Sequence, residues 1–174
     1  MSVLRYFDAY PAATQAQVRE LIETDRLAGY LHRRYAARHE IRTDKALYEY
    51  AIGLKQQYLR SAASLHKVVY QNKMDVLRSV LGLHTTISRV QGGRLKSKQE
   101  IRIASLFKDA PPEFLEMVVV HELAHLKESE HNKAFYQLCR HMLPDYHQIE
   151  FDLRLYLAHR ELVDSAAAVT LKPL

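Results

Sequence analysis

The first third of the chain alternates apolar and polar positions at helical spacing. In the stretch QVRELIETDRLAGYLHRRY after Pro11, apolar residues follow roughly the helical period: Val18, Leu21, Ile22, Ala28 and Leu31. A second stretch starts at Thr43 and repeats this spacing with Leu47, Tyr50, Ala51, Leu54 and Tyr58. Each stretch predicts one amphipathic helix whose apolar face is turned to a core. The short, charged segment AARHEIR between them does not indicate a domain boundary.

After His66 the pattern becomes typical of β-strands. The segments KVVYQ, VLRSVLGLHTTISRV and EIRIASLF are rich in β-branched residues, and in the last one Ile101 and Ile103 alternate with Arg102. Gly92 and Gly93 lie between the last two segments, where glycine supplies the positive φ of a hairpin turn. We therefore expect a small antiparallel sheet.

The remaining chain predicts three more helices. The first starts at Pro112, because proline is tolerated in a first helical turn, and runs towards Lys127. It is apolar on nearly all sides, which is typical of a buried central helix. The second begins near His131, and EFDLRLYLAHREL forms the last one. Residues 165–174 are expected to fray.

Composition narrows the class of protein. A length of 174 residues, with 48% apolar and 26% charged residues, is typical of one globular domain. The single cysteine, Cys139, excludes an internal disulfide, and MSVLRYFDAY lacks the apolar stretch of a secretory signal. No window approaches the ~18 apolar residues of a membrane span. We therefore expect a cytoplasmic protein without a membrane partner.

The chain carries a formal charge of +5 and has a pI near 9.3. A basic balance favours anionic partners such as nucleotides, nucleic acid or acidic polypeptides. No nucleic-acid-binding motif accompanies the charge, so nucleic acid stays a possible partner without a motif to support it.

The buried helix contains the pattern HELAH, in which His121 and His125 are one helical turn apart. This spacing lets both imidazoles reach one metal ion ~2.0–2.1 Å away. Glu122 is offset from that face, where it can contact a metal-bound water without being a ligand. Imidazoles and a carboxylate would be costly in a buried helix without partners. The pattern therefore predicts a metal site.

A catalytic zinc ion usually has three protein ligands and one open position. His131 is the predicted third ligand, and Glu128 is an alternative, with Glu150 and His147 less favoured. We expect the helix to end near Lys127 or Glu128, and Ser129 or a neighbour to cap a new helix whose first turn carries His131. The expected cofactor is one Zn²⁺ per chain, although imidazole-rich sites also accept other transition metals.

The predicted chemistry is metal-assisted hydrolysis, with Glu122 as the catalytic residue that takes a proton from the metal-bound water. Candidates for stabilising the developing negative charge on the substrate are Tyr136, Tyr146 and His147.

Several segments together resemble the YgjP group of zincin-type proteins, which is related to SprT-like and WLM-type metallopeptidases. They are VVVHELAHL, EHNKAFYQLCRHMLPDYHQIEFDLRLYL, TDKALYEY, NKMDVLRSVLGLH and TTISRVQGGRLKSKQEIRIASLF. The resemblance implies an α+β, minigluzincin-like zincin fold with N-terminal helices, a small antiparallel sheet, a buried HExxH helix and C-terminal helices. It also implies metal ligation by His121, His125 and His131 and catalysis by Glu122. Relatives often carry a Trp-Gly-Ser-Cys element that this tryptophan-free chain lacks.

The resemblance predicts a single metallopeptidase-like domain over residues 1–174, helical in about 1–64, with the sheet and the metal-site helices in 65–162. The resemblance also implies that the segment EIRIASLF forms a strand beside the active-site cleft, where an extended peptide can add as a further strand. A zinc-dependent metallopeptidase is the leading function. The resemblance also suggests a pyrophosphohydrolase of uridine triphosphate.

A cluster of cations lies on the predicted hairpin and supplies the candidate substrate-binding residues for a triphosphate: Arg89, Arg94, Lys96, Lys98 and Arg102. The interpretation that we favour is a solvated hairpin whose charges protect an edge strand. A non-catalytic metal-binding or DNA-binding module and a DNA-dependent protease are hypotheses of other classes. The intact Glu122 argues against a purely structural metal site, which needs no adjacent base.

Overall fold

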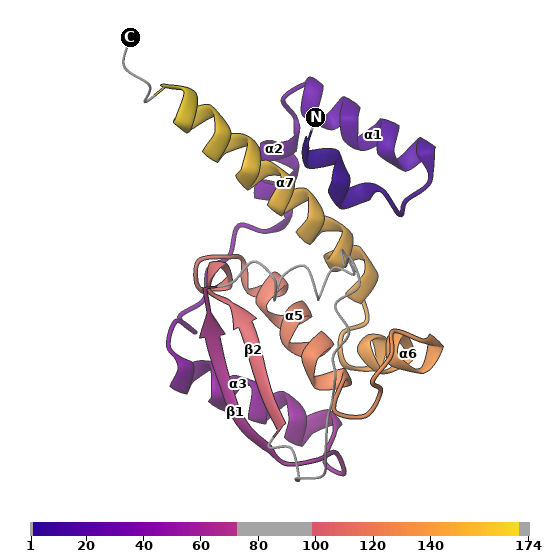
Figure 1. Ribbon diagram of the computed structural model, residues 1–174, viewed down its shortest axis with the longest axis vertical. Coiled ribbons are helices and arrows are strands. Elements are labelled where there is room, and N and C mark those ends of the chain that lie inside the picture. The colour runs from indigo at the N-terminus through magenta and orange to yellow at the C-terminus, as the bar shows by residue number, and fades with distance from the viewer. Residues whose placement is uncertain (1, 73–98, 171–174) are drawn as a thin grey trace, which may run out of the picture. The chain divides into compact units, whose positions relative to one another are not determined.

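The computed structural model describes residues 2–72 and 99–170 (Figure 1). The chain divides into two compact units, one formed by Met1–Ala36 with Gln148–Leu174 and the other by Ala37–His147. The first unit combines both ends of the chain, so it does not coincide with the N-terminal helical region that the sequence predicts to extend to about residue 64. The single domain over 1–174 stays a prediction.

The first unit is helical in its described residues. It contains η1 (Ser2–Phe7), α1 (Ala12–Glu23), α2 (Leu27–Arg34) and most of α7 (Tyr146–Thr170). Since α7 reaches Thr170, it includes the beginning of the segment 165–174 for which fraying is predicted. In the described residues, no helix is both long enough and apolar enough to cross a membrane.

The prediction of one continuous helix after Pro11 is wrong, because the helix is interrupted between α1 and α2. Asp25 has a φ of 54°, in the left-handed region. A right-handed helix cannot continue through such a residue, and aspartate is among the few non-glycine residues that tolerate this conformation. Helical spacing alone does not reveal this break, because the apolar positions on both sides keep nearly the same period.

A buried carboxylate joins α2 to α7 within the first unit. The Asp152 side chain is fully buried. It accepts hydrogen bonds from the hydroxyls of Tyr30 (2.9 Å) and Tyr35, from Arg34 Nε (3.1 Å) and from Gln148 Nε2 (3.2 Å). Both carboxylate oxygens therefore have donors supplied by the protein, which offsets the cost of burying the charge.

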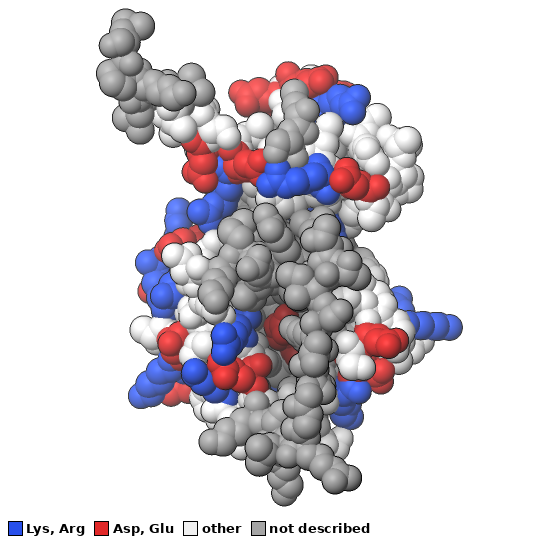
Figure 2. All heavy atoms as spheres, in the orientation of Figure 1, with Lys and Arg blue, Asp and Glu red and all other residues white. Residues whose placement is uncertain are grey.

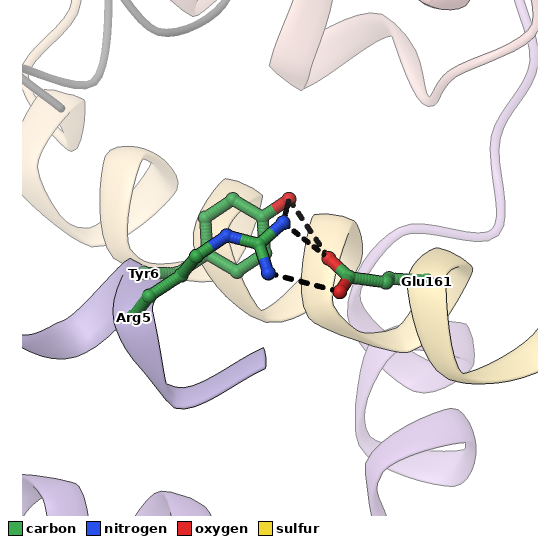
Figure 3. Close-up of polar contacts among 3 residues, drawn as sticks. All are labelled: Arg5, Tyr6 and Glu161. Carbon is green, nitrogen blue, oxygen red and sulfur yellow. Dashed lines mark hydrogen bonds and ion pairs between the residues drawn. The ribbon is translucent and has the colours of Figure 1, made fainter. Parts of the chain in front are cut away.

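A second polar contact joins η1 to α7 (Figure 3). The two terminal nitrogens of Arg5 donate to the two carboxylate oxygens of Glu161 at 3.0 and 2.8 Å, and the Tyr6 hydroxyl lies 3.3 Å from Glu161 Oε2. The two parallel bonds fix the geometry of the pair. Because the Arg5 side chain is 47% exposed, solvent screens the attraction between the two charges.

The second unit packs helices against a short sheet. It contains α3 (Asp44–Tyr58), β1 (Leu65–Gln71), β2 (Gln99–Ala104), η2 (Ser105–Lys108), α5 (Pro112–Ala124) and α6 (Lys133–Met142). Helix α3 begins where the sequence predicts it. Thr43 is its N-cap and its hydroxyl accepts a hydrogen bond from the Ala46 amide at 3.2 Å.

The α+β class is confirmed, but the predicted antiparallel sheet is wrong in direction. Strands β1 and β2 pair in parallel, with Val68 opposite Ile101 and Tyr70 opposite Ile103. A two-residue turn can join antiparallel neighbours, whereas parallel strands need a connection of a dozen residues or more, which residues 72–98 supply. The predicted hairpin at Gly92 and Gly93 lies outside the described residues.

Helix α5 forms the centre of the second unit and lies beside β2 (Figure 1). From Met117 to His121 every residue of this helix is buried, as the apolar pattern predicts. Strand β2 turns Ile101 and Ile103 inwards and leaves Arg102 exposed. The site residues on α5 are therefore attached to the most buried helix of this unit.

Candidate metal centre

The end of α5 carries the HELAH pattern. The regular helix ends at Ala124, and His125 is its C-cap, so the predicted end near Lys127 or Glu128 is too late. The Lys127 and Glu128 amides still donate to the Ala124 carbonyl oxygen, both at 3.0 Å. The chain thus keeps a helix-like turn after Ala124, and the imidazoles of His121 and His125 stay on one side of it.

Helix α6 begins later than the sequence suggests. Its N-cap is Asn132, whose side chain accepts a hydrogen bond from the Phe135 amide at 2.9 Å. The cap is thus Asn132 rather than Ser129, and the prediction that His131 lies in the first turn of this helix is wrong. Asparagine is at least as good an N-cap as serine, and this choice leaves His131 in the connection before the helix.

Three imidazole nitrogens converge in the second unit. The Nε2 atom of His121 lies 3.3 Å from that of His125 and 3.1 Å from that of His131, and the last two are 3.0 Å apart. Nitrogens bound about 2.0–2.1 Å from a tetrahedral zinc ion are roughly 3.3–3.4 Å apart. Among the described residues, this triad is the group whose donor atoms are placed to hold a metal ion.

The opposite ring nitrogens of two of these histidines have their own contacts. His125 Nδ1 lies 2.9 Å from the backbone oxygen of Glu128, and His121 Nδ1 lies 2.7 Å from the Tyr146 hydroxyl. A carbonyl oxygen only accepts, so His125 Nδ1 must carry a proton. In the neutral His125 ring, Nε2 then presents a lone pair to the other two histidines. This donor set fits a metal ion.

Burial keeps one of the three histidines neutral. His121 is 2% exposed, and its pKa is lowered from 6.5 to about 2 by burial first and then by the neighbouring His125 and His131. Neutral imidazole is the form that binds metals. The other two histidines are less buried and His131 is exposed, so the site is open to solvent on the His131 side.

An aromatic ring supports the triad. The buried Phe135 ring, in the first turn of α6, lies with its centroid 4.9 Å from that of His121, 4.6 Å from that of His125 and 4.8 Å from that of His131. The sequence pattern marks Phe135 only as a core position of its helix. The sequence contained one indication that Phe135 lies near the triad, because Phe135 follows His131 by only four residues.

Glu122, the predicted catalytic residue, follows His121 on α5 and is half-buried. Consecutive residues of a helix are rotated by about 100° around its axis. The side chain of Glu122 therefore starts from a different side of the helix than the side chain of His121.

The alternative third ligands have other contacts. Glu128 contributes its backbone oxygen to His125, and the Glu150 side chain pairs with Arg154 at 2.9 Å. The His147 ring lies 5.3 Å from the Tyr136 ring. Of the residues weighed from the sequence, the structure therefore brings His131 to the histidine pair.

The candidates for stabilising negative charge on a substrate occupy different places. Tyr146 is buried and its hydroxyl contacts His121, a contact that no local pattern predicts. Tyr136 is half-buried, with its ring 6.3 Å from that of His131, and His147 is exposed. Tyr136 and His147 therefore lie nearer the solvent side of the site.

Most of the predicted cationic cluster, namely Arg89, Arg94, Lys96 and Lys98, lies outside the described residues. Arg102 is exposed on β2, where its side chain contacts Glu100 at 3.1 Å and Gln71 at 3.3 Å. Positive and negative side chains are interspersed on the face shown in Figure 2. The described portion of the cluster is thus a charge-paired strand surface, and its role in substrate binding stays a prediction.

Comparison with known proteins extends this picture. The family model "YgjP-like, metallopeptidase domain" matches residues 69–156. A relative from Escherichia coli (strain K12), named UTP pyrophosphatase, is 57% identical over 162 residues, which cover 93% of this chain and 97% of that protein. No solved structure shows a significant match. The matches confirm the resemblance drawn from the motifs, and the chain belongs to the YgjP-like family.

Proposed function

We propose that this chain is a metal-dependent hydrolase that acts on UTP as a pyrophosphatase. The carrying observation is the convergence of three Nε2 atoms within 3.3 Å of one another, in a chain 57% identical to a UTP pyrophosphatase. The sequence alone ranks this activity second to peptide hydrolysis. The name of the relative favours the nucleotide over the peptide and reverses that order.

His121, His125 and His131 are the proposed ligands of one metal ion per chain. Three neutral imidazoles suit zinc, copper, iron or nickel, and a three-ligand site with one open position is typical of catalytic zinc. A bound ion would supply Lewis-acid chemistry by polarising phosphate oxygens and lowering the pKa of water. The exposed side of His131 is the proposed entry for the substrate.

Glu122 is the proposed general base. It accepts a proton from the attacking water while the water oxygen bonds to phosphorus and the P–O bond of the phosphoanhydride breaks. The proton then passes to the departing pyrophosphate. Tyr136 and His147, on the solvent side of the triad, are the proposed donors to the charge that develops on the phosphoryl oxygens.

The first test measures metal content and hydrolysis on the same samples of the parent and of Glu122→Gln. Both proteins should hold about one metal ion per chain, since Glu122 is not a ligand. Only the parent should hydrolyse UTP, with a rate loss of about 10²- to 10⁴-fold in the variant. A parent that binds no metal, or a variant as active as the parent, would refute the proposal. Retained metal without any hydrolysis in the parent would favour a non-catalytic metal-binding module.

A metallopeptidase is the second candidate, because the matching family model describes a metallopeptidase domain. The two candidates differ in their need for cations. Neutralising Lys96, Lys98 and Arg102 together to glutamine should abolish UTP hydrolysis and change cleavage of an uncharged peptide little. Casein and a nucleoside triphosphate panel serve as substrates. Hydrolysis of casein alone by the parent would make the peptidase the better assignment.

A further inference from the structure

Tyr146 stands out among the residues around the triad because it combines complete burial with a polar contact to one histidine. It is 1% exposed, and its hydroxyl lies 2.7 Å from His121 Nδ1. The planes of the two rings are 16° apart. Its backbone is also held, because the Tyr146 amide donates to the Leu143 carbonyl oxygen at 3.0 Å. The phenol is thus fixed in place at the start of α7.

The tyrosine faces the back of the His121 ring. His121 Nε2 points at His125 and His131, and Nδ1, on the other side of the ring, points at the phenol. The neutral ring has two tautomers, and each leaves one nitrogen with the lone pair that a metal needs. A partner that accepts a hydrogen bond from the N–H group at Nδ1 selects the tautomer with the lone pair at Nε2.

We infer that Tyr146 is a positioning residue whose hydroxyl oxygen accepts a hydrogen bond from His121 Nδ1 and thereby holds Nε2 ready to bind a metal ion. The inference deepens the proposed function, since it rests on the triad as the metal site. The backbone oxygen of Glu128 has the same role for His125, but no side-chain substitution removes a backbone oxygen. Tyr146 is therefore the member of this outer layer that can be tested.

This role differs from the one that the sequence suggests for Tyr146. A donor to charge on the substrate must reach the open side of the site. The Tyr146 hydroxyl is buried behind His121, which separates it from the other two imidazoles. Loss of the hydroxyl should therefore act on the metal and on the His121 ring, and not on substrate binding at constant metal occupancy.

The direct test is the tautomer of His121 in the metal-free parent, measured by long-range ¹H–¹⁵N NMR of the imidazoles at pH 8. A His121→Gln variant assigns the signals. The expected spectrum shows the proton on Nδ1, and in Tyr146→Phe a fraction with the proton on Nε2 appears. A parent with the His121 proton on Nε2 overturns the inference, whatever the variant does. The measurement on the parent stays valid even if the Tyr146→Phe variant does not fold.

The second test is affinity for zinc, measured by competition with a chromogenic chelator. Tyr146→Phe should bind zinc roughly 10- to 100-fold more weakly than the parent, the range typical of lost outer-layer partners. Tyr70→Phe is the matched control, because it also loses a tyrosine hydrogen bond in the same unit. That bond goes to the Ile41 carbonyl oxygen at 2.6 Å and not to a histidine of the triad. The control should bind zinc like the parent.

The outcomes separate this inference from the proposed function. Equal zinc affinity of Tyr146→Phe and the parent, together with an unchanged tautomer, overturns the role of Tyr146. A parent with the proton on Nδ1 that binds no metal overturns the proposed function and the metal-binding part of the inference, and it supports only the role of Tyr146 in fixing the ring. An equal loss of affinity in both tyrosine variants would assign the effect to general destabilisation and overturn the inference.

Discussion

Each of the two compact units contains a polar centre, and the two centres are built in opposite ways. In the first unit, Asp152 collects donors: two tyrosine hydroxyls, a guanidinium and an amide all point at one carboxylate. In the second unit, three groups of the same kind point at one another, with Nε2 atoms 3.0 to 3.3 Å apart. The chain itself supplies the hydrogen-bond donors for the carboxylate, whereas the three imidazoles surround a common point.

The difference separates a structural centre from the proposed metal centre. A buried acceptor that receives hydrogen bonds from donors of the same protein adds to the stability of the fold. Three imidazole lone pairs directed at one point repel each other, and their arrangement becomes favourable when a cation binds at their centre. The two centres should therefore respond in opposite ways when one member is removed.

The largest expected effect is on metal binding, upon removal of an exposed member of the triad. His131→Ala should weaken zinc binding by more than the roughly 10- to 100-fold typical of outer-layer partners, because it removes a ligand. The free energy of unfolding of the chelator-treated protein should change by no more than about 0.5 kcal/mol, as is usual for exposed positions. Competition with a chelator and urea denaturation measure the two quantities.

The matched control is His141→Ala. His141 is also exposed in the second unit, and its ring packs on Tyr58 at 5.7 Å, away from the triad. It should bind zinc like the parent. Parent-like zinc affinity in His131→Ala would show that the triad is not the metal site and would remove the contrast between the two centres.

The next effect concerns stability, upon removal of the buried carboxylate. Asp152→Ala leaves two tyrosine hydroxyls in a partly buried environment without their acceptor, and should lower the free energy of unfolding by about 2 to 3 kcal/mol. Arg34 adds little to this loss, because its side chain is 45% exposed and can be hydrated. Urea denaturation measures the change, and zinc affinity should stay at the parent value.

Asp164→Ala controls for loss of a carboxylate from the same helix, since Asp164 is exposed on α7; a change within about 0.5 kcal/mol is expected. If Asp152→Ala lost zinc affinity while keeping its stability, Asp152 would belong to the metal centre and the assignment of the two centres would be wrong.

The smallest expected effect is on the pH dependence of stability in chelator-treated protein. The pKa of His121 is lowered from 6.5 to about 2 in the folded state, so below pH 6.5 the unfolded chain binds a proton that the folded chain does not. Stability should therefore fall as the pH falls below about 6.5, with a slope from this group of at most ~1.4 kcal/mol per pH unit. Urea denaturation at several pH values between 7 and 5 measures the slope.

The same series on His121→Gln isolates this contribution from the other histidines. The variant should show a shallower slope than the parent. Identical slopes in the two proteins would mean that His121 takes up its proton as easily in the folded state as in the unfolded chain.

Much of the fold follows from local pattern. Thr43 marks the start of α3, the apolar run before His121 marks the buried helix, and Ile101 and Ile103 mark the inner face of β2. The break at Asp25 is missed because the apolar period continues across it. The direction of the sheet is missed because a strand's pattern reports which face is buried and carries no information on which strand lies beside it.

The site divides in the same way. The spacing of His121 and His125 suffices to place both on one side of a helix, so this pair was predictable. The third member, His131, ranks above Glu128, Glu150 and His147 because of its distance from His125 along the chain and because of the family resemblance. The cap at Asn132 rather than Ser129 shows how little that distance says about the path between Lys127 and Asn132, where two good capping residues compete.

By itself, the sequence determines the α+β class, the buried helix, the histidine pair with its adjacent glutamate, and the family to which they belong, because all of these depend on residue types at short spacing. Only the tertiary structure decides that the strands are parallel, that His131 joins the pair, and that Tyr146 and Phe135 surround it. These contacts join elements that are separate along the chain, and a periodic pattern within one element does not encode its neighbours in space.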